Sequence, residues 1–580
     1  MNVGEPEVID LLSSDEECSV SKEKSDTAPI IIEKNPRNAK VVKVERDELE
    51  KPKKKKRERK PIPILKILTF ENVKGHKFSV SVDAFNYKKH DSIDHYFLSH
   101  FHADHYYGIT KGWNNGEIYC SEITANLLAL KYKINPSIIH PLKLNVTYEL
   151  VDNLFITLID ANHCPGAAII LFEYITNMKK KSNIKEEDNL YENNYHDMQE
   201  DEIWELLERE KFGIEENNIL NESSNLNNRR FIRACENCGI KVFRILHTGD
   251  FRVCKTIICN SLIANHKIDK LYLDTTYFDP RYTFPDQDLV VKQFAEFVVE
   301  LVYGVFFQNL AESNGKGDST LLYFQKRITD FFTEKPKEPP KTKRKTKSKA
   351  GSYENEFLGP STGFNKFKYN YLICIGTYTI GKEKIAIELA KKLNLKIYAN
   401  GAKREIFNTF TDSDHSSFRD LIIDDPFATN IHLVPMRSIS SPALLEAYYK
   451  PLRLTYKNII GIRPTGWTLR SKPSFTAHEL RTLTNEEILA ATVNNDKVHS
   501  FGIDDFYAQF NASKVLQIYN IPYSEHSSFR ELCMFIILLN VQQVIPTVNL
   551  HNLESIRRME QWVSICKKMK EEKHYSIEDF

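Results

Sequence analysis

The sequence predicts a mixed α/β fold, and two observations lead to that expectation. Short apolar runs of strand length recur along the 580 residues, and helical patterns follow several of them. The hydrophobic fraction of 41%, with 11% aromatic residues, is typical of a globular protein. At ~100–200 residues per domain, the length allows roughly two to four domains. Alternating strands and helices of this kind indicate a mixed α/β protein, and no solenoid repeat is present.

The expected elements follow from the spacing of apolar residues. Strands are predicted where compact apolar runs are bounded by polar residues, at 94–98, 155–160, 242–247, 270–274, 371–375, 459–462 and 515–519. Helices are predicted where apolar residues recur every three or four positions, at 125–131, 289–302, 384–393 and 528–539.

Three polar segments are predicted to lie outside the folded body. Residues 1–62 have few aromatics and many charges, which indicates a disordered tail. Residues 177–230 are rich in Asn and Glu, and we expect a flexible insert there. Residues 334–369 contain KPKEPPKTKRKTKSK, in which prolines and like charges oppose compaction. The folded body would then consist of three parts, 63–277, 278–454 and 455–580. The insert 177–230 would interrupt the first part, and the basic insert 334–369 would interrupt the second.

Composition also narrows the class of protein. Lys plus Arg number 79 against 78 Asp plus Glu, so the formal charge of +1 hides opposing basic and acidic blocks rather than marking an overall polycation. The longest apolar stretches, 294–307 and 534–544, are shorter than the ~20 residues of a membrane span. The N-terminus lacks the pattern of a signal peptide, and ten scattered cysteines fit a reducing compartment. We therefore expect an intracellular monomer without a membrane segment.

The sharpest feature is the run Ser-His-Phe-His-Ala-Asp-His at 99–105, directly after a predicted strand. Four potential metal ligands occupy six positions at a strand end, where a loop can turn them toward one point. Imidazole and carboxylate groups are ligands that zinc accepts. A chance cluster of polar residues is the less convincing interpretation. Three further candidates follow predicted strands: DANHCPG at 160–166, HTGDFR at 247–252 and SEHSS at 524–528.

Together these motifs resemble the metallo-β-lactamase superfamily. The resemblance implies one or two zinc ions, with His100, His102 and His163 on one metal, Asp104, His105 and His526 on the second, and Asp250 bridging the two. Asp83 matches an earlier aspartate of the superfamily that orients the histidine loop. Asp104 and Asp250 could also receive the proton of the attacking water. Asp274 corresponds to an acidic position near the site, for which we expect a supporting or proton-handling role.

Four other motifs narrow the resemblance. YLDTTY at 272–277, GTYTIGKEK at 376–384, GIRPTGW at 461–467 and IPTVN at 545–549 resemble the β-CASP nucleases of the DNA cross-link repair branch, relatives of Artemis and Apollo. The resemblance covers about 65–563. That branch carries Val, here Val548, where RNA-processing β-CASP enzymes carry His, which points to DNA by analogy.

The resemblance implies a fold and an activity. The fold would be an αββα metallo-β-lactamase sandwich, formed by 63–277 and 455–580, with a β-CASP domain inserted at 278–454. The activity would be that of a nuclear, zinc-dependent, 5′-phosphate-directed 5′-to-3′ DNA exonuclease in cross-link or DNA-end repair. A structure-selective endonuclease acting on hairpins or overhangs is one alternative. A non-catalytic repair scaffold is another, although a complete ligand set argues against it.

Two nearly identical segments compete for the late metal histidine, SDHSSFR at 413–419 and SEHSSFR at 524–530. The second follows the predicted strand 515–519 and precedes IPTVN in the order of the family. We therefore assign His526, and expect His415 to be a surface residue beside a helix cap.

The segment GTYTIGKEK suggests an anion site. A strand runs into a glycine and the start of a helix, whose free N–H groups and positive dipole end attract anions. We expect a 5′-phosphate of DNA to bind there, with the candidate contacts Thr377, Lys382, Lys384, Ser527 and Ser528. The alternative is that this turn is only a connection.

Two peptide motifs suggest partners. VIDLL followed by acidic residues resembles a SUMO-interacting motif, through Val8, Ile9, Leu11 and Leu12. QKRITDFF resembles the peptide that binds the sliding clamp (PCNA), through Gln325, Ile328, Phe331 and Phe332. An ordinary amphipathic helix end is an equally good interpretation of the second motif. The basic run 53–60 could be a nuclear localisation signal or an arm that contacts phosphates.

Overall fold

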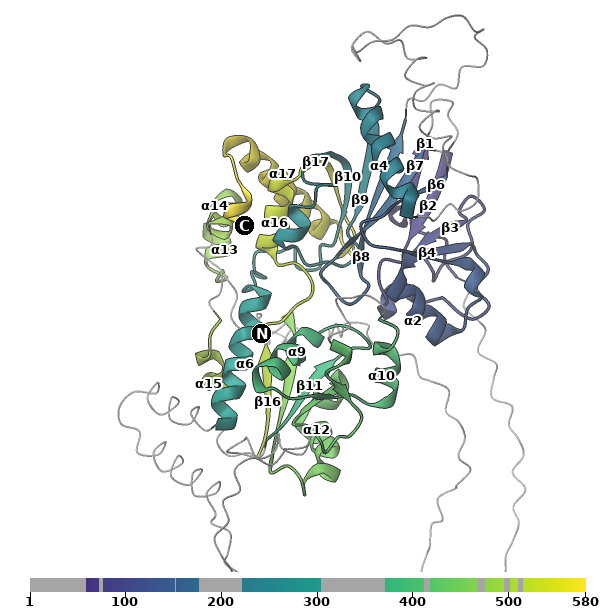
Figure 1. The fold of residues 1–580 in the computed structure, drawn as a ribbon. Coiled ribbons are helices and arrows are strands. Elements are labelled where there is room, and N and C mark those ends of the chain that lie inside the picture. Colours follow the sequence, from purple (N-terminus) through teal and green to yellow (C-terminus); the bar gives the residue numbers. More distant parts are fainter. Residues whose placement is uncertain are drawn as a thin grey trace, which may run out of the picture.

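Three β-sheets surrounded by helices form the part of the chain that the computed structural model describes (Figure 1). The described residues are 59–71, 77–151, 153–176, 222–303, 371–410, 418–466, 475–494, 501–509 and 515–580. The SUMO-like and clamp-like motifs, His415, the basic insert 334–369 and the basic run up to residue 58 lie outside them. Among the described residues, no helix has both the length and the apolar character needed to cross a bilayer.

The first sheet contains five strands in the order β1-β2-β3-β4-β5. The first pair is antiparallel and the other pairs are parallel. Its strands are β1 (Ile67–Glu71), β2 (Lys77–Val82), β3 (His95–Phe97), β4 (Glu117–Ser121) and β5 (Ile139–Leu142). Helices α1 (Ala103–Tyr106) and α2 (Glu122–Tyr132) connect them, with short turns of 3-10 helix at η1 (Ile64–Lys66) and η2 (Pro136–Ile138).

The second sheet contains six strands in the order β17-β10-β9-β8-β7-β6. These are β6 (Thr147–Val151), β7 (Leu154–Asp160), β8 (Ala168–Ile175), β9 (Val242–His247), β10 (Lys267–Leu273) and β17 (Asn540–Pro546). The helices that belong with this sheet are α4 (Glu222–Asn237), α5 (Lys255–Ile258), α16 (Phe529–Leu538) and α17 (Leu553–Glu572), followed by the turn η7 (Ile577–Asp579).

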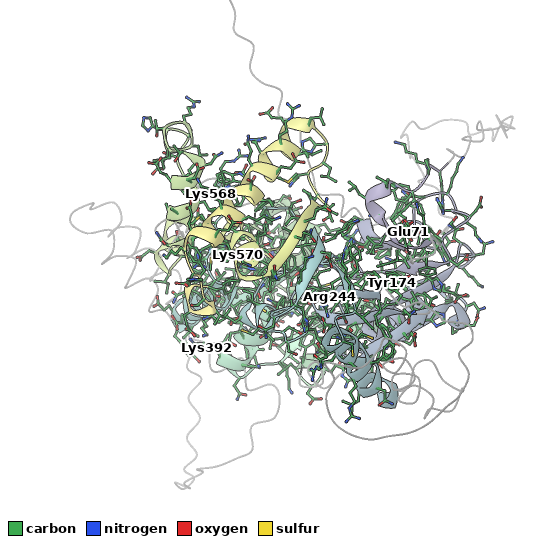
Figure 2. The ribbon with its side chains drawn as sticks, turned by 90° about the horizontal axis from the view of Figure 1, so that it is seen from above. Glu71, Tyr174, Arg244, Lys392, Lys568 and Lys570 are labelled. Atoms are coloured by element: carbon green, nitrogen blue, oxygen red, sulfur yellow. The ribbon has the colours of Figure 1, made fainter. Side chains whose placement is uncertain are left out.

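The two sheets pack face to face through an apolar core. The rings of Phe97 and Phe172 meet edge to face, with their centroids 5.0 Å apart, and Phe70 lies 6.0 Å from Phe172. Viewed from above, Lys568 and Lys570 of α17 and Glu71 of the first sheet lie on opposite sides, with the second sheet between them (Figure 2). The predicted αββα sandwich is therefore confirmed.

The third sheet lies below the sandwich in Figure 1 and is parallel throughout, in the order β13-β12-β14-β11-β15-β16. Its strands are β11 (Tyr371–Thr377), β12 (Ile397–Tyr398), β13 (Ile422–Ile423), β14 (Ile431–Pro435), β15 (Asn458–Pro464) and β16 (Leu516–Ile521). The remaining helices and turns of the described chain are α6 (Gln287–Tyr303), α9 (Glu383–Leu393), α10 (Gly401–Phe407), η4 (Met436–Ile439), α12 (Pro442–Tyr449), η5 (Lys450–Leu452), α13 (Glu479–Thr482), α14 (Asn485–Val493) and α15 (Asp504–Gln509). Of these, α14 packs against α16 and α17 of the sandwich.

Each of the predicted strands and helices is present. The largest differences are at element starts: β10 begins at Lys267 rather than at 270, and α2 begins at Glu122 rather than at 125. The start of α2 is fixed by Ser121, whose side chain accepts a hydrogen bond from the Thr124 N–H.

The predicted boundary at 454 does not match the sheet. β15 pairs in parallel with β11, and β16 pairs with β15, so the third sheet extends past that boundary to Ile521. The apolar runs of β15 and β16 carry no local signal of which sheet they join, because parallel pairing is decided by contacts far away in the sequence.

The predicted insert at 177–230 is also too long. Helix α4 begins at Glu222, and its polar side chains dock on the second sheet. Asn225 accepts a hydrogen bond from the Thr147 N–H, and Arg229 forms an ion pair with the buried carboxylate of Glu173. Arg244 pairs with the same carboxylate. A segment that looks solvated in sequence thus folds because it neutralises a buried charge.

Candidate metal centre

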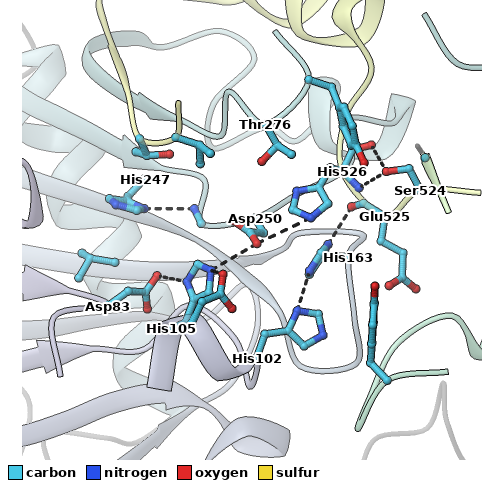
Figure 3. A pocket seen from close by; sticks show the side chains of 18 of the residues that line it. Asp83, His102, His105, His163, His247, Asp250, Thr276, Ser524, Glu525 and His526 are labelled. Carbon is cyan, nitrogen blue, oxygen red and sulfur yellow. Dashed lines mark hydrogen bonds and ion pairs between the residues drawn. The ribbon is translucent and has the colours of Figure 1, made fainter. Parts of the chain in front are cut away.

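A pocket of about 540 Å³ lies where the loops after β3, β7, β9 and β16 meet (Figure 3). The strands are rigid and buried, and the polar residues follow their ends, so side chains distant in sequence converge there. The pocket lining includes His102, Asp104, His105, His163, Asp250 and His526. His100 lies behind them and is fully buried.

Asp83 fixes the histidine loop after β3. Its backbone is left-handed, with φ of 51°, and is held by a hydrogen bond from its N–H to the Phe97 carbonyl. The carboxylate accepts bonds from the Ser99 N–H at 2.9 Å, from the Ser99 hydroxyl at 2.7 Å and from His105 Nδ1 at 2.7 Å. Burial would raise the pKa of Asp83, but the charge and hydrogen bond of His105 lower it to about 2. The Asp83 carboxylate thus contacts both Ser99 and His105 of the histidine loop.

Three imidazole nitrogens face one another in the first half of the centre. His102 Nδ1 lies 3.0 Å from His100 Nε2 and 3.2 Å from His163 Nε2. The other ring nitrogen of two of these histidines donates a hydrogen bond to a backbone carbonyl. His163 Nδ1 donates to Glu525 at 2.8 Å, and His102 Nε2 donates to Ile380 at 3.2 Å.

His100 also donates through its Nδ1, which leaves the lone pair of its Nε2 facing His102. The Ser99 hydroxyl gives its one proton to Asp83, so it accepts from His100 Nδ1 at 3.0 Å. The pKa values of His100 and His163 are lowered well below the usual 6.5 by burial and by the neighbouring imidazoles. Three lone pairs therefore point at one another, which is the donor set that a divalent metal ion requires.

Asp250 lies at the middle of the second half. Its Oδ2 is 3.3 Å from His105 Nε2, 3.7 Å from His100 Nε2 and 3.9 Å from His526 Nε2. His526 donates its Nδ1–H to the buried Asp274 at 2.8 Å, which leaves Nε2 facing Asp250. Burial opposes the charge on His526, but Asp274 and Asp250 outweigh it and raise its pKa to about 9.

Asp104 occupies the edge of the pocket. Its Oδ2 is 3.4 Å from His105 Nε2, and its side chain is about half exposed. Burial would raise the pKa of Asp104, but His105 and His102 lower it below its usual value. Among the described residues, the convergent ligand groups contain His100, His102, His105, His163, Asp250 and His526, and they do not include Asp104.

The structure does not bring the five expected phosphate contacts together. Ser527 donates to the Phe251 carbonyl, and Ser528 caps α16 through the Glu531 N–H. Thr377 is buried and lies outside the pocket lining, as does Lys384, which donates to Asn162. Only Lys382 lines the pocket, where its Nζ donates to the Pro464 carbonyl.

The start of α9 is not open to an anion as expected. The N–H of Lys382, at the N-cap, donates to the Glu525 carboxylate at 2.5 Å. A carboxylate from the loop after β16 thus occupies the positive end of the helix. Burial and the neighbouring Glu383 raise the pKa of Glu525 to about 7, against the opposing effect of Lys382. Sequence reasoning missed this contact because 143 positions separate the two residues.

Arg252 is a second residue that the sequence did not single out. Its guanidinium is buried and donates to the Ser524 carbonyl at 2.7 Å, the Pro285 carbonyl at 3.1 Å and Glu531 at 2.9 Å. It thereby joins the loop that carries Asp250 to the loop that carries His526. Its position two residues after Asp250 in HTGDFR was the available signal.

Replacing Asp274 with Asn is expected to weaken metal binding by about 10–100-fold, because the partner that orients His526 would lose its charge. Isothermal titration with Zn²⁺ measures this. Asp269→Asn is the matched control, since Asp269 is also buried but pairs with Lys267 and the Arg244 backbone outside the pocket. An unchanged zinc affinity in Asp274→Asn would contradict the orienting role.

Known proteins similar to this chain are metallo-β-lactamase and DNA cross-link repair proteins. Residues 416–552 match the family described as DNA repair metallo-beta-lactamase. The chain is 29% identical over 544 residues to the DNA cross-link repair protein PSO2/SNM1 of Saccharomyces cerevisiae, covering 88% of this chain and 67% of that protein. It is 30% identical over 491 residues to the DNA cross-link repair protein SNM1 of Arabidopsis thaliana, covering 85% and 68%.

A shorter match covers one segment at higher identity. Over 100 residues the chain is 40% identical to the 5′ exonuclease Apollo of Danio rerio, which corresponds to 16% of this chain and 18% of that protein. The chain thus spans about two thirds of the length of its yeast and plant relatives and a small part of the zebrafish one.

Proposed function

The chain belongs to the β-CASP family of DNA cross-link repair nucleases, and from that premise we propose that it is a zinc-dependent exonuclease acting on 5′-phosphorylated DNA ends. The observation that carries this proposal is the convergence of the imidazole nitrogens of His100, His102 and His163 on one point, beside a second group formed by His105, His526 and Asp250. His100, His102 and His163 would hold one ion and His105 and His526 a second, with Asp250 as a shared carboxylate ligand and Asp104 at the edge of the pocket.

Zinc, when bound, would activate a water for attack at neutral pH and neutralise charge on the phosphate. The protein supplies the rest. Asp83 and Asp274 hold His105 and His526 in the orientation that keeps each Nε2 toward the pocket. Asp104, whose side chain is half exposed at the edge, would accept the proton of the attacking water.

The shape of the pocket supports action at a DNA end. A volume of about 540 Å³ suits a ligand about as large as one nucleotide, and not a duplex. Tyr378 and Lys382 line one wall, and the Lys382 ammonium lies 4.1 Å from the centre of the Tyr378 ring. We assign the terminal 5′-phosphate to this wall because Lys382 is the one member of the expected set that reaches the pocket. The name of the zebrafish relative, a 5′ exonuclease, agrees with this proposal.

The test compares single-stranded DNA that carries a 5′-phosphate, a 5′-hydroxyl or a closed hairpin end. We expect the 5′-phosphorylated strand to be shortened stepwise at least about tenfold faster than the 5′-hydroxyl strand, because a charged contact is worth about 1.5–3 kcal/mol. Gel analysis of labelled products over time measures the rates. Equal rates would remove the phosphate contact, and preferential hairpin opening would favour the endonuclease.

Partners and location are proposed from motifs that lie wholly or, for the basic run, mostly outside the described residues. SUMO and the sliding clamp are proposed partners through the motifs at 8–12 and 325–332, and nuclear location rests on the basic run 53–60 and on the repair family.

A further inference from the structure

One rim of the pocket is a strap of residues 59–66 that carries exposed apolar side chains. Ile64 is 83% exposed and Leu65 is 39% exposed. Leu65 and Lys66 line the pocket, and Ile64 precedes them in the chain. The side chains near the histidines are polar, so Ile64 and Leu65 are not expected to take part in metal binding.

The disordered tail predicted at 1–62 extends too far, because residues 59–62 belong to this strap, which is fixed to the protein at both ends. Arg59 donates to the Gly108 carbonyl at 3.3 Å, and the Lys60 carbonyl accepts from the Lys88 N–H at 2.8 Å. Ile62 is buried in the core, and Lys66 Nζ donates to the Asp83 carbonyl at 2.7 Å. Leu65 is therefore held at the pocket mouth and Ile64 directly beside it, and both expose apolar surface to water that a ligand could cover.

The strap faces the second half of the metal centre. Lys66 reaches the carbonyl of Asp83, and the carboxylate of Asp83 binds His105. Tyr378 and Lys382 also line the pocket. A DNA strand that enters the pocket along this rim would contact Leu65, and Ile64 is the exposed side chain next to it.

The chemistry of this rim fits a nucleotide. The flat face of a base is apolar and can pack on aliphatic side chains, while the phosphates on either side need cations. Arg59, Lys60 and Lys66 supply positive charge along the same eight residues. Because a volume of about 540 Å³ suits one nucleotide, the base that follows it in the strand would be the one nearest to the rim.

We propose that Ile64 and Leu65 form a binding site for the nucleobase that follows the nucleotide being removed. The contact does not read sequence, since every base presents an apolar face. This proposal rests on the proposed nuclease function, and it adds that full affinity requires a base at the second position of the strand.

The experiment uses two 5′-phosphorylated single strands, one with normal bases and one with an abasic tetrahydrofuran unit at the second position. In the wild type, the abasic strand is expected to show a KM about fivefold higher, with kcat unchanged, because the apolar contact is missing. Ile64→Ser is expected to raise KM about fivefold on the normal strand and to leave the abasic strand unaffected. Ile64→Leu retains the wild-type KM because it retains the apolar surface.

The matched control is Leu454→Ser, which removes a fully exposed leucine after η5 in the third-sheet region, outside the pocket lining. It is expected to change neither strand. An equal rise in KM on both strands for Ile64→Ser, or no rise at all, would overturn the base contact. A wild-type dimer that Ile64→Ser dissociates without altering the DNA kinetics would assign the strap to a second copy of the chain and overturn it too. Failure of the wild type to cut any DNA would instead overturn the proposed function on which this inference rests.

Discussion

Asp250→Asn is expected to lower the rate of DNA cleavage about a thousandfold or more, and to lower the zinc content of the protein. The substitution keeps the size of the side chain and removes the carboxylate that, among the described residues, lies within 4 Å of His100, His105 and His526 alike. Metal ions supply several kcal/mol to catalysis, and about 1.4 kcal/mol corresponds to a factor of ten in rate. The measurements are the initial rate on 5′-phosphorylated DNA and the metal content by elemental analysis.

The matched control is Asp288→Asn, the same chemical change at an exposed position in the first turn of α6. It is expected to retain wild-type activity and metal content. If Asp250→Asn binds zinc and cuts DNA as the wild type does, Asp250 is not the bridging ligand.

Arg252→Met is expected to destabilise the protein by about 3–5 kcal/mol, because it removes one partner of a buried ion pair. The substitution leaves the Glu531 carboxylate and the carbonyls of Ser524 and Pro285 without this donor. Since Ser524 is two residues before His526, zinc affinity should fall as well. Urea unfolding of the zinc-loaded protein and zinc titration measure the two effects.

Arg281→Met serves as its control. Arg281 is about half exposed and pairs with Asp279 two residues away, and such surface pairs contribute about 0–1 kcal/mol. The two variants should therefore differ by at least about 2 kcal/mol in the free energy of unfolding. A similar small loss in both would mean that the two loops do not depend on Arg252.

Much of the site could be predicted because its signals are local. The histidine run follows β3 directly, and the motifs with His163, Asp250 and His526 each follow a buried strand, so side chains at strand ends converge. The choice of His526 over His415 also used a local pattern, the strand before it and the helix after it. The fold class was predictable for the same reason, since strand and helix periodicities are written in consecutive residues.

The rest depends on contacts between distant segments. The carboxylate of Glu525 occupies the start of α9, and this cannot be read from either segment alone. The hydroxyls of Ser527 and Ser528 look available in the sequence but are used by the fold. The polar face of α4 looks solvated until Glu173 is seen beneath it. In each case a polar group satisfies a buried partner that the sequence does not reveal.

Removal and return of zinc, followed by cleavage of 5′-phosphorylated DNA by the wild type and by Asp250→Asn, tests the metal centre most directly. Chelation is expected to abolish cleavage by the wild type, and stoichiometric zinc is expected to restore it, with no restoration in Asp250→Asn. Cleavage at the original rate by protein shown to be free of metal would contradict the assignment of this pocket as a metal-dependent nuclease centre.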